Sequence, residues 1–267
     1  MTPGSLRMYW RYADVSFRSQ MQYRGSFALR AVGLFLATGT EFLGFVALFQ
    51  RFGQIRGWEL PHMALFYGII SVAFATAEAA ARGFDIFPQL IKSGDFDRVL
   101  VRPRSAALQV LGQEFQLMRA GRWAQGVMVL SWGAWQLDVW SLANVALLVV
   151  AIAGGTCLFA GLFVLQATLC FWTTESLEIF NCTTYGGVEA GQFPLSIYRP
   201  WFRVFFTFVI PLATINYFPV HAILSLDDVL GSTRVMQWLS PLAGVIFLAV
   251  CLQFWRAGVR HYTSTGS

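Results

Sequence analysis

The sequence predicts an all-α integral membrane protein, and three observations support this fold class. Apolar residues make up 56% of the 267 residues and charged residues only 12%. Several runs of about 20 residues contain no unpaired charge, which is the length a helix needs to cross roughly 30 Å of hydrocarbon. Little sequence remains between these runs, so a separate soluble domain has no room to fold. We therefore predict a single transmembrane domain over residues 1–267.

Six membrane spans are predicted, each placed where apolar residues run without an unpaired charge. Tryptophan lies near several of the expected ends, as in the headgroup belts of membrane proteins. The third span is the shortest apolar run, and Arg119 and Arg122 at its start are expected to snorkel toward water. The six ranges are Phe27–Phe49, Pro61–Ala81, Arg119–Leu137, Trp140–Trp172, Trp201–Ile223 and Trp238–Trp255.

The distribution of arginine and lysine predicts the orientation in the membrane. With both termini in the cytoplasm, most of the 19 basic residues fall on the cytoplasmic side, where such residues are retained. The large loop 82–118 is then cytoplasmic. Residues 1–26 are expected to form an amphipathic helix on the inner leaflet, with arginines toward the headgroups. The residues it would offer to lipid are Leu6, Trp10, Phe17 and Met21.

The sequence contains no motif of a catalytic, metal or nucleotide site. There is no GxxxxGK phosphate loop, no HExxH and no CxxC, so no catalytic residue, metal ligand or bound cofactor is predicted. Glu41 is the deepest carboxylate in the predicted spans. A charge at mid-bilayer costs about 2.5–3.5 kcal/mol on insertion scales and by default marks a pathway or a helix–helix partner. We interpret Glu41 either as a residue of a translocation path or as a structural hydrogen-bonding group.

The cytoplasmic loop carries the most distinctive pattern, in the stretch "FDIFPQLIKSGDFD". Phe87, Leu90 and Ile91 fall on one side of a short helix that begins at Pro88, and a glycine break follows. A plain solvated loop does not need such an apolar face. We therefore predict that this helix docks into a groove on a partner protein.

Three separated stretches carry a resemblance to a known family: "KSGDFDRVLVRPRSAALQVLGQEFQLMRAGR", "FPLSIYRPWFRVFFTFVIPLATINYFP" and "FWRAGVRHYTSTGS". They resemble the membrane subunits of type-2 ABC transporters, in the branch of largely uncharacterised six-span export permeases. The resemblance implies a permease subunit of the bacterial inner membrane that exports its cargo. A separate ABC ATPase, in two copies, would bind ATP and Mg²⁺ and dock on the loop between spans two and three.

The resemblance also assigns roles to particular residues. It implies a second permease, identical or homologous, so that a dimer forms the pathway, and a fifth span that breaks near its outer end. Membrane lipids are expected partners and nucleic acid is not. The cargo stays open, because one fold serves many substrates. The ATPase-coupling residues would be Phe87, Pro88, Leu90, Ile91, Gly94, Asp95, Asp97, Arg98, Arg102 and Pro103. The residues expected on the translocation path, from their position in the predicted spans, are Glu41, Asn216, Pro211 and Pro219.

Two other classes of function stay open from the sequence. An ion- or proton-coupled secondary transporter would need a relay within the spans, for which Glu41 and Asn216 are the candidates. A membrane-embedded enzyme would need a catalytic cluster, and Glu175, Glu178 and Glu189 are the densest acidic group. Because no histidine or metal pattern accompanies them, we interpret these three glutamates as part of a solvated or partner-facing connector before the fifth span.

Overall fold

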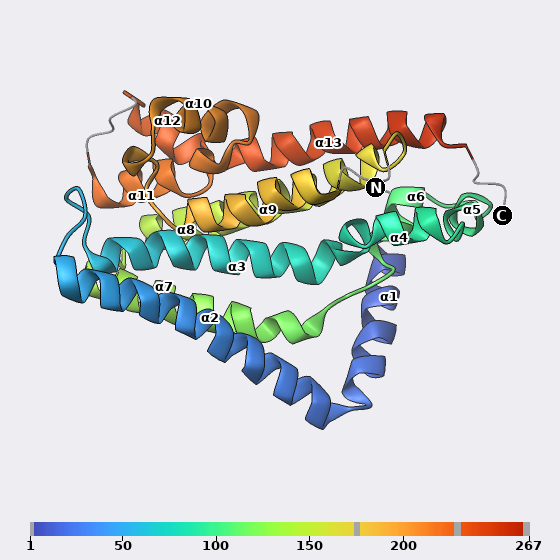
Figure 1. Ribbon diagram of the computed structural model, residues 1–267, viewed down its shortest axis with the longest axis horizontal. Helices are drawn as coiled ribbons and strands as arrows, with labels where there is room; N and C mark the ends of the chain where they lie inside the picture. Colours follow the sequence, from blue (N-terminus) through green and yellow to red (C-terminus); the bar gives the residue numbers. More distant parts are fainter. Residues whose placement is uncertain (1–2, 174–176, 227–230, 264–267) are drawn as a thin grey trace.

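The computed structural model describes residues 3–173, 177–226 and 231–263, and within these residues the chain is almost entirely helical. Long helices lie side by side along one axis, and short helices gather at both ends (Figure 1). The elements are α1 (Pro3–Met21), α2 (Arg24–Phe52), α3 (Leu60–Asp85), α4 (Phe87–Lys92), α5 (Phe96–Leu100), α6 (Ala106–Leu111), η1 (Leu117–Arg119), α7 (Ala120–Gln136), α8 (Leu142–Leu169), α9 (Leu177–Gly191), η2 (Leu195–Ile197), α10 (Pro200–Val204), η3 (Phe205–Val209), η4 (Leu212–Thr214), α11 (Tyr217–Leu224), α12 (Arg234–Leu239) and α13 (Leu242–His261).

Four stretches of the described chain are long and apolar enough to cross a membrane: α2, α3 extended by α4 (Leu60–Lys92), α8 and α13. A further pair, Pro200–Val209 and Leu212–Leu224, passes the same test jointly but is bent by 76°. The predicted all-α class is confirmed, and the first, second, third, fourth and sixth predicted spans correspond to α2, α3, α7, α8 and α13. Six crossings remain a prediction.

Helix α3 lies at the centre of the bundle. It packs mainly against α7 on one side and α8 on the other, while α2 covers α7 and α13 covers α8. The residues of α3 from Met63 to Ala75 are all buried. Its backbone approaches α7 closely, because a Cβ atom added at Gly68 would lie 2.5 Å from the Cβ and 2.8 Å from the Cα of Leu130. A small residue is therefore required at this crossing.

We expect Gly68→Ala to lower the free energy of unfolding by about 1–3 kcal/mol, because α7 must move to admit the methyl group. Gly39→Ala in α2 is the matched control, since a Cβ there meets nothing within 4 Å and alanine is the better helix former. Thermal unfolding of both variants in the same detergent would measure the difference. Equal midpoints for the two variants would contradict the close contact between α3 and α7.

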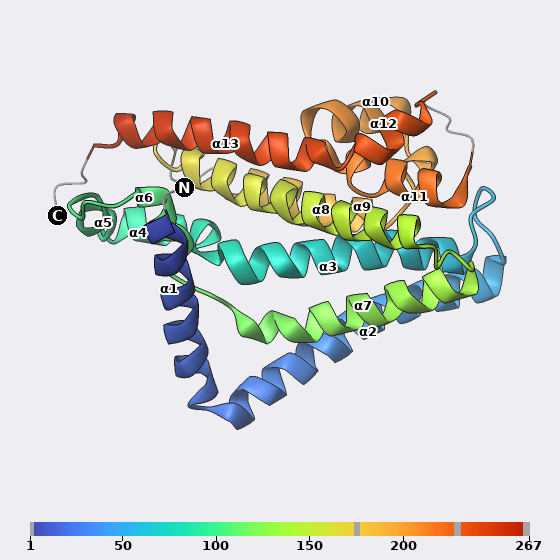
Figure 2. The same ribbon diagram turned by 180° about the vertical axis from the view of Figure 1, so that it is seen from behind.

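The segment before the predicted fifth span, predicted as a solvated or partner-facing connector, is in its described part a helix of the bundle, and its Glu189 is exposed. Helix α9 packs on α3 and α8. It runs beside them from the end that carries α4–α6 to the end that carries α10–α12 (Figures 1 and 2). Its 15 residues include Glu189 and several small or polar residues, which is why hydropathy does not reveal it. Glu175 and the side chain of Glu178 lie outside the described residues.

The predicted fifth span, Trp201–Ile223, does not run the length of the bundle. Its two arms, α10 with η3 and η4 with α11, lie together at the end that also carries the α2–α3 connection (Figure 1). The break falls at Pro211, between Val209 and Leu212. Pro219 lies in the first turn of α11, where a helix tolerates proline. The predicted break is therefore confirmed at Pro211 and is wrong at Pro219.

The N-terminal segment is a helix, as predicted, and lies across the end of the bundle that carries α4–α6 (Figure 1). Its contacts with the bundle include two hydrogen bonds: the Tyr9 hydroxyl donates to the carbonyl of Ala80, and the Ser16 hydroxyl to that of Phe115. Trp10 and Phe17 are exposed. Met21 is partly buried, and the side chain of Leu6 lies outside the described residues. The exposed aromatic rings suit a helix that rests on a membrane surface.

Candidate functional site

A polar cluster joins α2, α3 and α7 near the middle of the bundle. The hydroxyl of Tyr67 in α3 lies 2.9 Å from the carbonyl oxygen of Thr38 and 3.1 Å from the amide oxygen of Gln125. Tyr67 and Gln125 are fully buried, and a polar group in such a place needs a partner. The cluster therefore fixes the relative position of three helices at the depth where Glu41 follows one turn after Thr38.

Two exposed carboxylates belong to the same region, since Glu41 also interacts electrostatically with Tyr67. Glu41 of α2 and Glu189 of α9 are close enough to interact electrostatically, and Glu189 also interacts with Arg122 of α7. Beyond them, the rings of Phe45 and Phe193 stack with centroids 4.8 Å apart. Because α2 and α9 carry the acidic groups on a face where both remain exposed, this face is the candidate translocation surface. We call it the acidic face (Glu41 and Glu189).

A second charged cluster lies at the end of the bundle near α4–α6. Arg119 at the end of η1 pairs with Glu78 of α3 at 3.0 Å, and the Glu78 side chain is only 1% exposed. Arg122 lies over the ring of Phe74, with its guanidinium carbon 5.0 Å from the ring centroid. The prediction that Arg119 and Arg122 snorkel toward water is therefore wrong. Both turn toward α3, where Arg119 pairs with the Glu78 carboxylate and Arg122 lies over the Phe74 ring.

Asn216 does not line an open path. It is buried, its amide donates to the carbonyl of Gly191 at 2.6 Å, and its side-chain oxygen accepts from the backbone of Tyr217 at 2.6 Å. Asn216 thus fastens the bent pair to the end of α9. Pro211 marks the bend and Pro219 is buried inside α11. Of the four residues assigned to the translocation path, Glu41 alone lies on the acidic face.

The loop between α3 and α7 forms a compact folded unit. Helix α4 is present as predicted, but its apolar face is turned inward, with Leu90 8% and Ile91 5% exposed and Phe87 and Pro88 also buried. Phe87 packs on Trp255 of α13 at 4.9 Å between ring centroids. The prediction that this face is offered to a partner is wrong. The chain itself covers it, because α13 and the end of α8 supply aromatic residues to pack against.

The motif that follows α4 has structural explanations for most of its residues. Gly94 has φ +73° and so occupies the left-handed region that favours glycine. The Ser93 hydroxyl donates to Asp95 at 2.8 Å, and Asp95 forms an exposed ion pair with Arg98 at 3.2 Å. Asp97 interacts with Tyr262 just after α13, and burial together with this carboxylate raises the pKa of Tyr262. The motif therefore ties the loop to the end of α13.

An uninterrupted run of exposed residues begins at the last residue of α5, and we call it the exposed tip (Leu100–Arg104). Val101 is 85% exposed, Leu100 is partly exposed and Arg102 is exposed. The amide of Gln109 donates to the carbonyl oxygens of Val99 and Arg104, at 3.0 and 3.3 Å. One buried side chain thus holds both ends of the tip, so its apolar and basic side chains are presented in a fixed shape.

Comparison with known protein families decides the identity of the chain. The sequence model described as ABC-2 family transporter protein matches residues 35–266. The chain belongs to the ABC-2 transporter family. This ABC-2 protein is accordingly a multi-pass membrane protein and a permease subunit of an ABC transporter, a type of subunit that works with an ABC ATPase. No curated protein and no solved structure gave a match.

In this ABC-2 permease subunit, the sequence did not single out Tyr67, Gln125 or Glu189 as neighbours of Glu41. Glu189 was assigned to a connector, and Tyr67 lies within an apolar run. Tyr67 and Gln125 both fall inside predicted spans. A polar side chain in a span needs a hydrogen-bond partner, and this requirement is the signal that could have indicated them. Within the described residues, no group of three His, Cys, Asp or Glu side chains could hold a metal ion.

Proposed function

We propose that this ABC-2 permease subunit exports its cargo by ATP-driven alternating access, as half of a dimer coupled to two copies of a separate ATPase. The partner permease is a second copy or a homologue. ATP and Mg²⁺ are held by the ATPase. Both termini and the α4–α6 loop face the cytoplasm of a bacterium, as the arginine distribution favours, and the end with the bent pair faces outward.

The observation that carries the proposal is the construction of the α3–α7 loop. Rings from α3, α4, α5, α13 and the turn just after α8 meet in one aromatic cluster, in which Phe87 contacts Phe96 and Phe171 at 4.9 and 5.3 Å between centroids. Such contacts add about 0.5–1.5 kcal/mol each beyond apolar burial. A force applied to the loop is therefore transmitted to three long helices. This is the property that a coupling element requires.

The mechanism follows from this rigidity. ATP binding closes the two ATPases, which displaces the exposed tip and, through the aromatic cluster, the inner ends of α3, α8 and α13. A dimeric pathway then switches between inward-facing and outward-facing packings of the same helices. The acidic face lines that pathway in our proposal, with Glu41 and Glu189 contributing its polar groups.

Purification of the tagged chain from its native membrane in mild detergent tests the proposal. We expect an ABC ATPase to co-purify in stoichiometric amount, and the preparation to hydrolyse ATP. A chain that repeatedly purifies without any nucleotide-binding partner, and has no ATPase activity, would overturn the proposed coupling.

A second candidate, an ion- or proton-coupled transporter, is favoured by the closeness of Glu41 and Glu189. Paired carboxylates at membrane depth are typical of proton relays. The two functions differ in their energy source. Transport in reconstituted vesicles that persists without ATP, follows an imposed pH gradient and is lost in Glu41→Gln would establish the second function in place of the first.

A further inference from the structure

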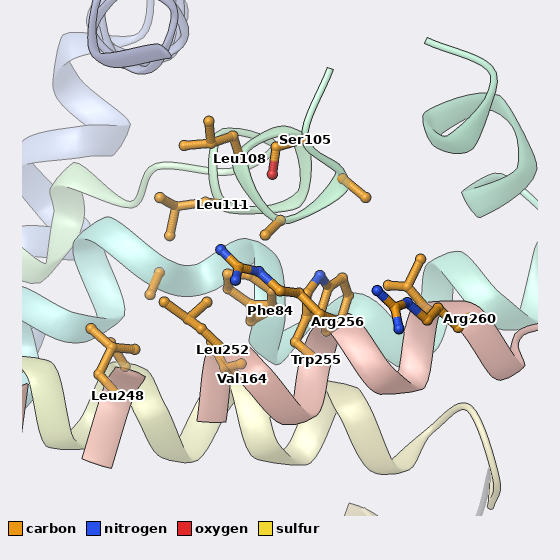
Figure 3. A pocket seen from close by; sticks show the side chains of 15 residues that line it. Phe84, Ser105, Leu108, Leu111, Val164, Leu248, Leu252, Trp255, Arg256 and Arg260 are labelled. Carbon is orange, nitrogen blue, oxygen red and sulfur yellow. The ribbon is translucent and has the colours of Figure 1, made fainter. Parts of the chain in front are cut away.

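A groove of about 820 Å³ opens at the end of the bundle near α4–α6, away from the acidic face. It is lined by the end of α3, by α13 from Leu248 to Arg260, by one side of α8 and by α6 (Figure 3). Twelve of the 15 lining residues are apolar, and Leu248, Leu252 and Val259 stay partly exposed along it. Its volume lies within the roughly 300–1,000 Å³ of ligand pockets. The groove is therefore large enough for a hydrophobic ligand and open enough to admit one.

Two arginines give this groove its charge. Arg256 and Arg260 of α13 are both exposed, and no lining residue is acidic. Figure 3 shows Arg256 extending over the apolar side chains toward α6, with Arg260 one turn farther along α13. The polar contact found for Arg256 is a neutral one, to the side-chain oxygen of Gln253 at 3.2 Å. The mouth of the groove thus presents two guanidinium groups that suit an anion such as a phosphate.

The groove and its charges match the depth of one membrane leaflet. Arg260 and Leu248 are 12 residues apart on one helix, which corresponds to about 18 Å at 1.5 Å per residue. One leaflet contributes roughly half of the 30 Å hydrocarbon core. A ligand with an anionic group at the arginines and an apolar chain reaching Leu248 would therefore lie as a phospholipid does in its leaflet.

We propose that this groove binds one anionic phospholipid, with its phosphate on Arg256 and Arg260 and an acyl chain along α13. Basic pockets between helices at this surface recognise anionic headgroups. The orientation proposed above makes this the inner leaflet, but the site itself does not depend on the nature of the cargo or on ATP.

Charge distinguishes this occupant from the two protein alternatives. A second copy pairing symmetrically across the groove would bring four arginines together without a lining carboxylate, which is unfavourable. A soluble ATPase could reach the arginines but not Leu248 or Ala160, which lie within the membrane-crossing parts of α13 and α8. The lipid satisfies the charged mouth and the apolar interior together.

Native mass spectrometry of the detergent-solubilised full chain, titrated with dioleoylphosphatidylglycerol or dioleoylphosphatidylcholine, tests this proposal. We expect one phosphatidylglycerol to bind preferentially and the doubly substituted Arg256→Gln, Arg260→Gln chain to bind it about 10- to 30-fold more weakly, from two charges at the surface. Arg256→Lys, Arg260→Lys keeps both charges and should retain most of the preference. Ala107→Trp, which fills the groove, should weaken the binding of both lipids.

The matched control is the chain with Arg51→Gln and Arg234→Gln, two exposed arginines outside the groove, at the end of α2 and the start of α12. Equal binding of the two lipids by the unsubstituted chain, or an equal loss in this control, would overturn the proposal. Full competition by soluble glycerol phosphate would also overturn it, because the site would then take a free phosphate and not a lipid. If the glutamine variant fails to fold, the lipid comparison and the glycerol phosphate competition on the unsubstituted chain still decide.

Discussion

Replacing Arg119 by alanine is expected to lower the free energy of unfolding by about 3 kcal/mol, the lower end of the range for removing one partner of a buried ion pair. Glu78 is 1% exposed and Arg119 is 19% exposed, with 3.0 Å between their charged atoms. The substitution leaves a carboxylate buried without its nearest cation. Arg122 and Arg82 also attract Glu78, which keeps the loss from being larger. Equilibrium unfolding in mixed detergent micelles would measure it.

Two variants make this result interpretable. Arg98→Ala breaks an ion pair of similar length whose side chains are 83% and 49% exposed, so it should cost less than about 1 kcal/mol. The double variant Glu78→Leu, Arg119→Met removes both charges and should recover most of the stability. If Arg119→Ala were as mild as Arg98→Ala, water would have to reach Glu78, and the ion pair would not fix η1 against α3.

The membrane helices could be predicted because each long apolar run has one stable environment. The ends of α2, α3 and α8 lie within three residues of those predicted, except that α3 continues four residues farther, from Ala81 to Asp85, through a kink at Ala81. Helix α9 could not be found in this way. Its polar and small residues are tolerated because α3 and α8 cover one side of it, and hydropathy does not contain that information.

The candidate site was predictable only at Glu41. The depth of a carboxylate can be read from sequence, but its neighbours depend on how α2 and α9 are placed around α3. The apolar face of α4 shows the same limit. Its periodicity correctly predicts a helix with something to cover it, yet nothing local distinguishes a partner protein from the chain's own Phe171 and Trp255. The assignment of Asn216 failed because a polar residue at a break can cap a helix as well as line a path.

Val101→Asp is expected to abolish stable association with the ATPase while leaving the chain folded. Val101 is 85% exposed, so a charge there does not disturb the core. If the exposed tip docks in a groove of the ATPase, the carboxylate must be desolvated at the interface, and a lost central contact costs at least about 2 kcal/mol, or roughly 30-fold in affinity. Co-purification with the ATPase and ATP hydrolysis by the complex would measure the effect.

Leu90→Asp is the variant that separates docking from folding. We expect Leu90→Asp to lose stability, whereas Val101→Asp should stay folded and lose the ATPase. Leu90 is only 8% exposed on the buried face of α4, so an aspartate there buries an unpaired charge and should cost at least about 4 kcal/mol of stability. Its unfolding midpoint should fall sharply, while that of Val101→Asp stays near the unsubstituted value. If Leu90→Asp proved stable and lost only the ATPase, then α4 would leave the core to dock, and the coupling surface would be its apolar face and not the exposed tip. A Val101→Asp chain that still binds the ATPase would remove the exposed tip from the interface.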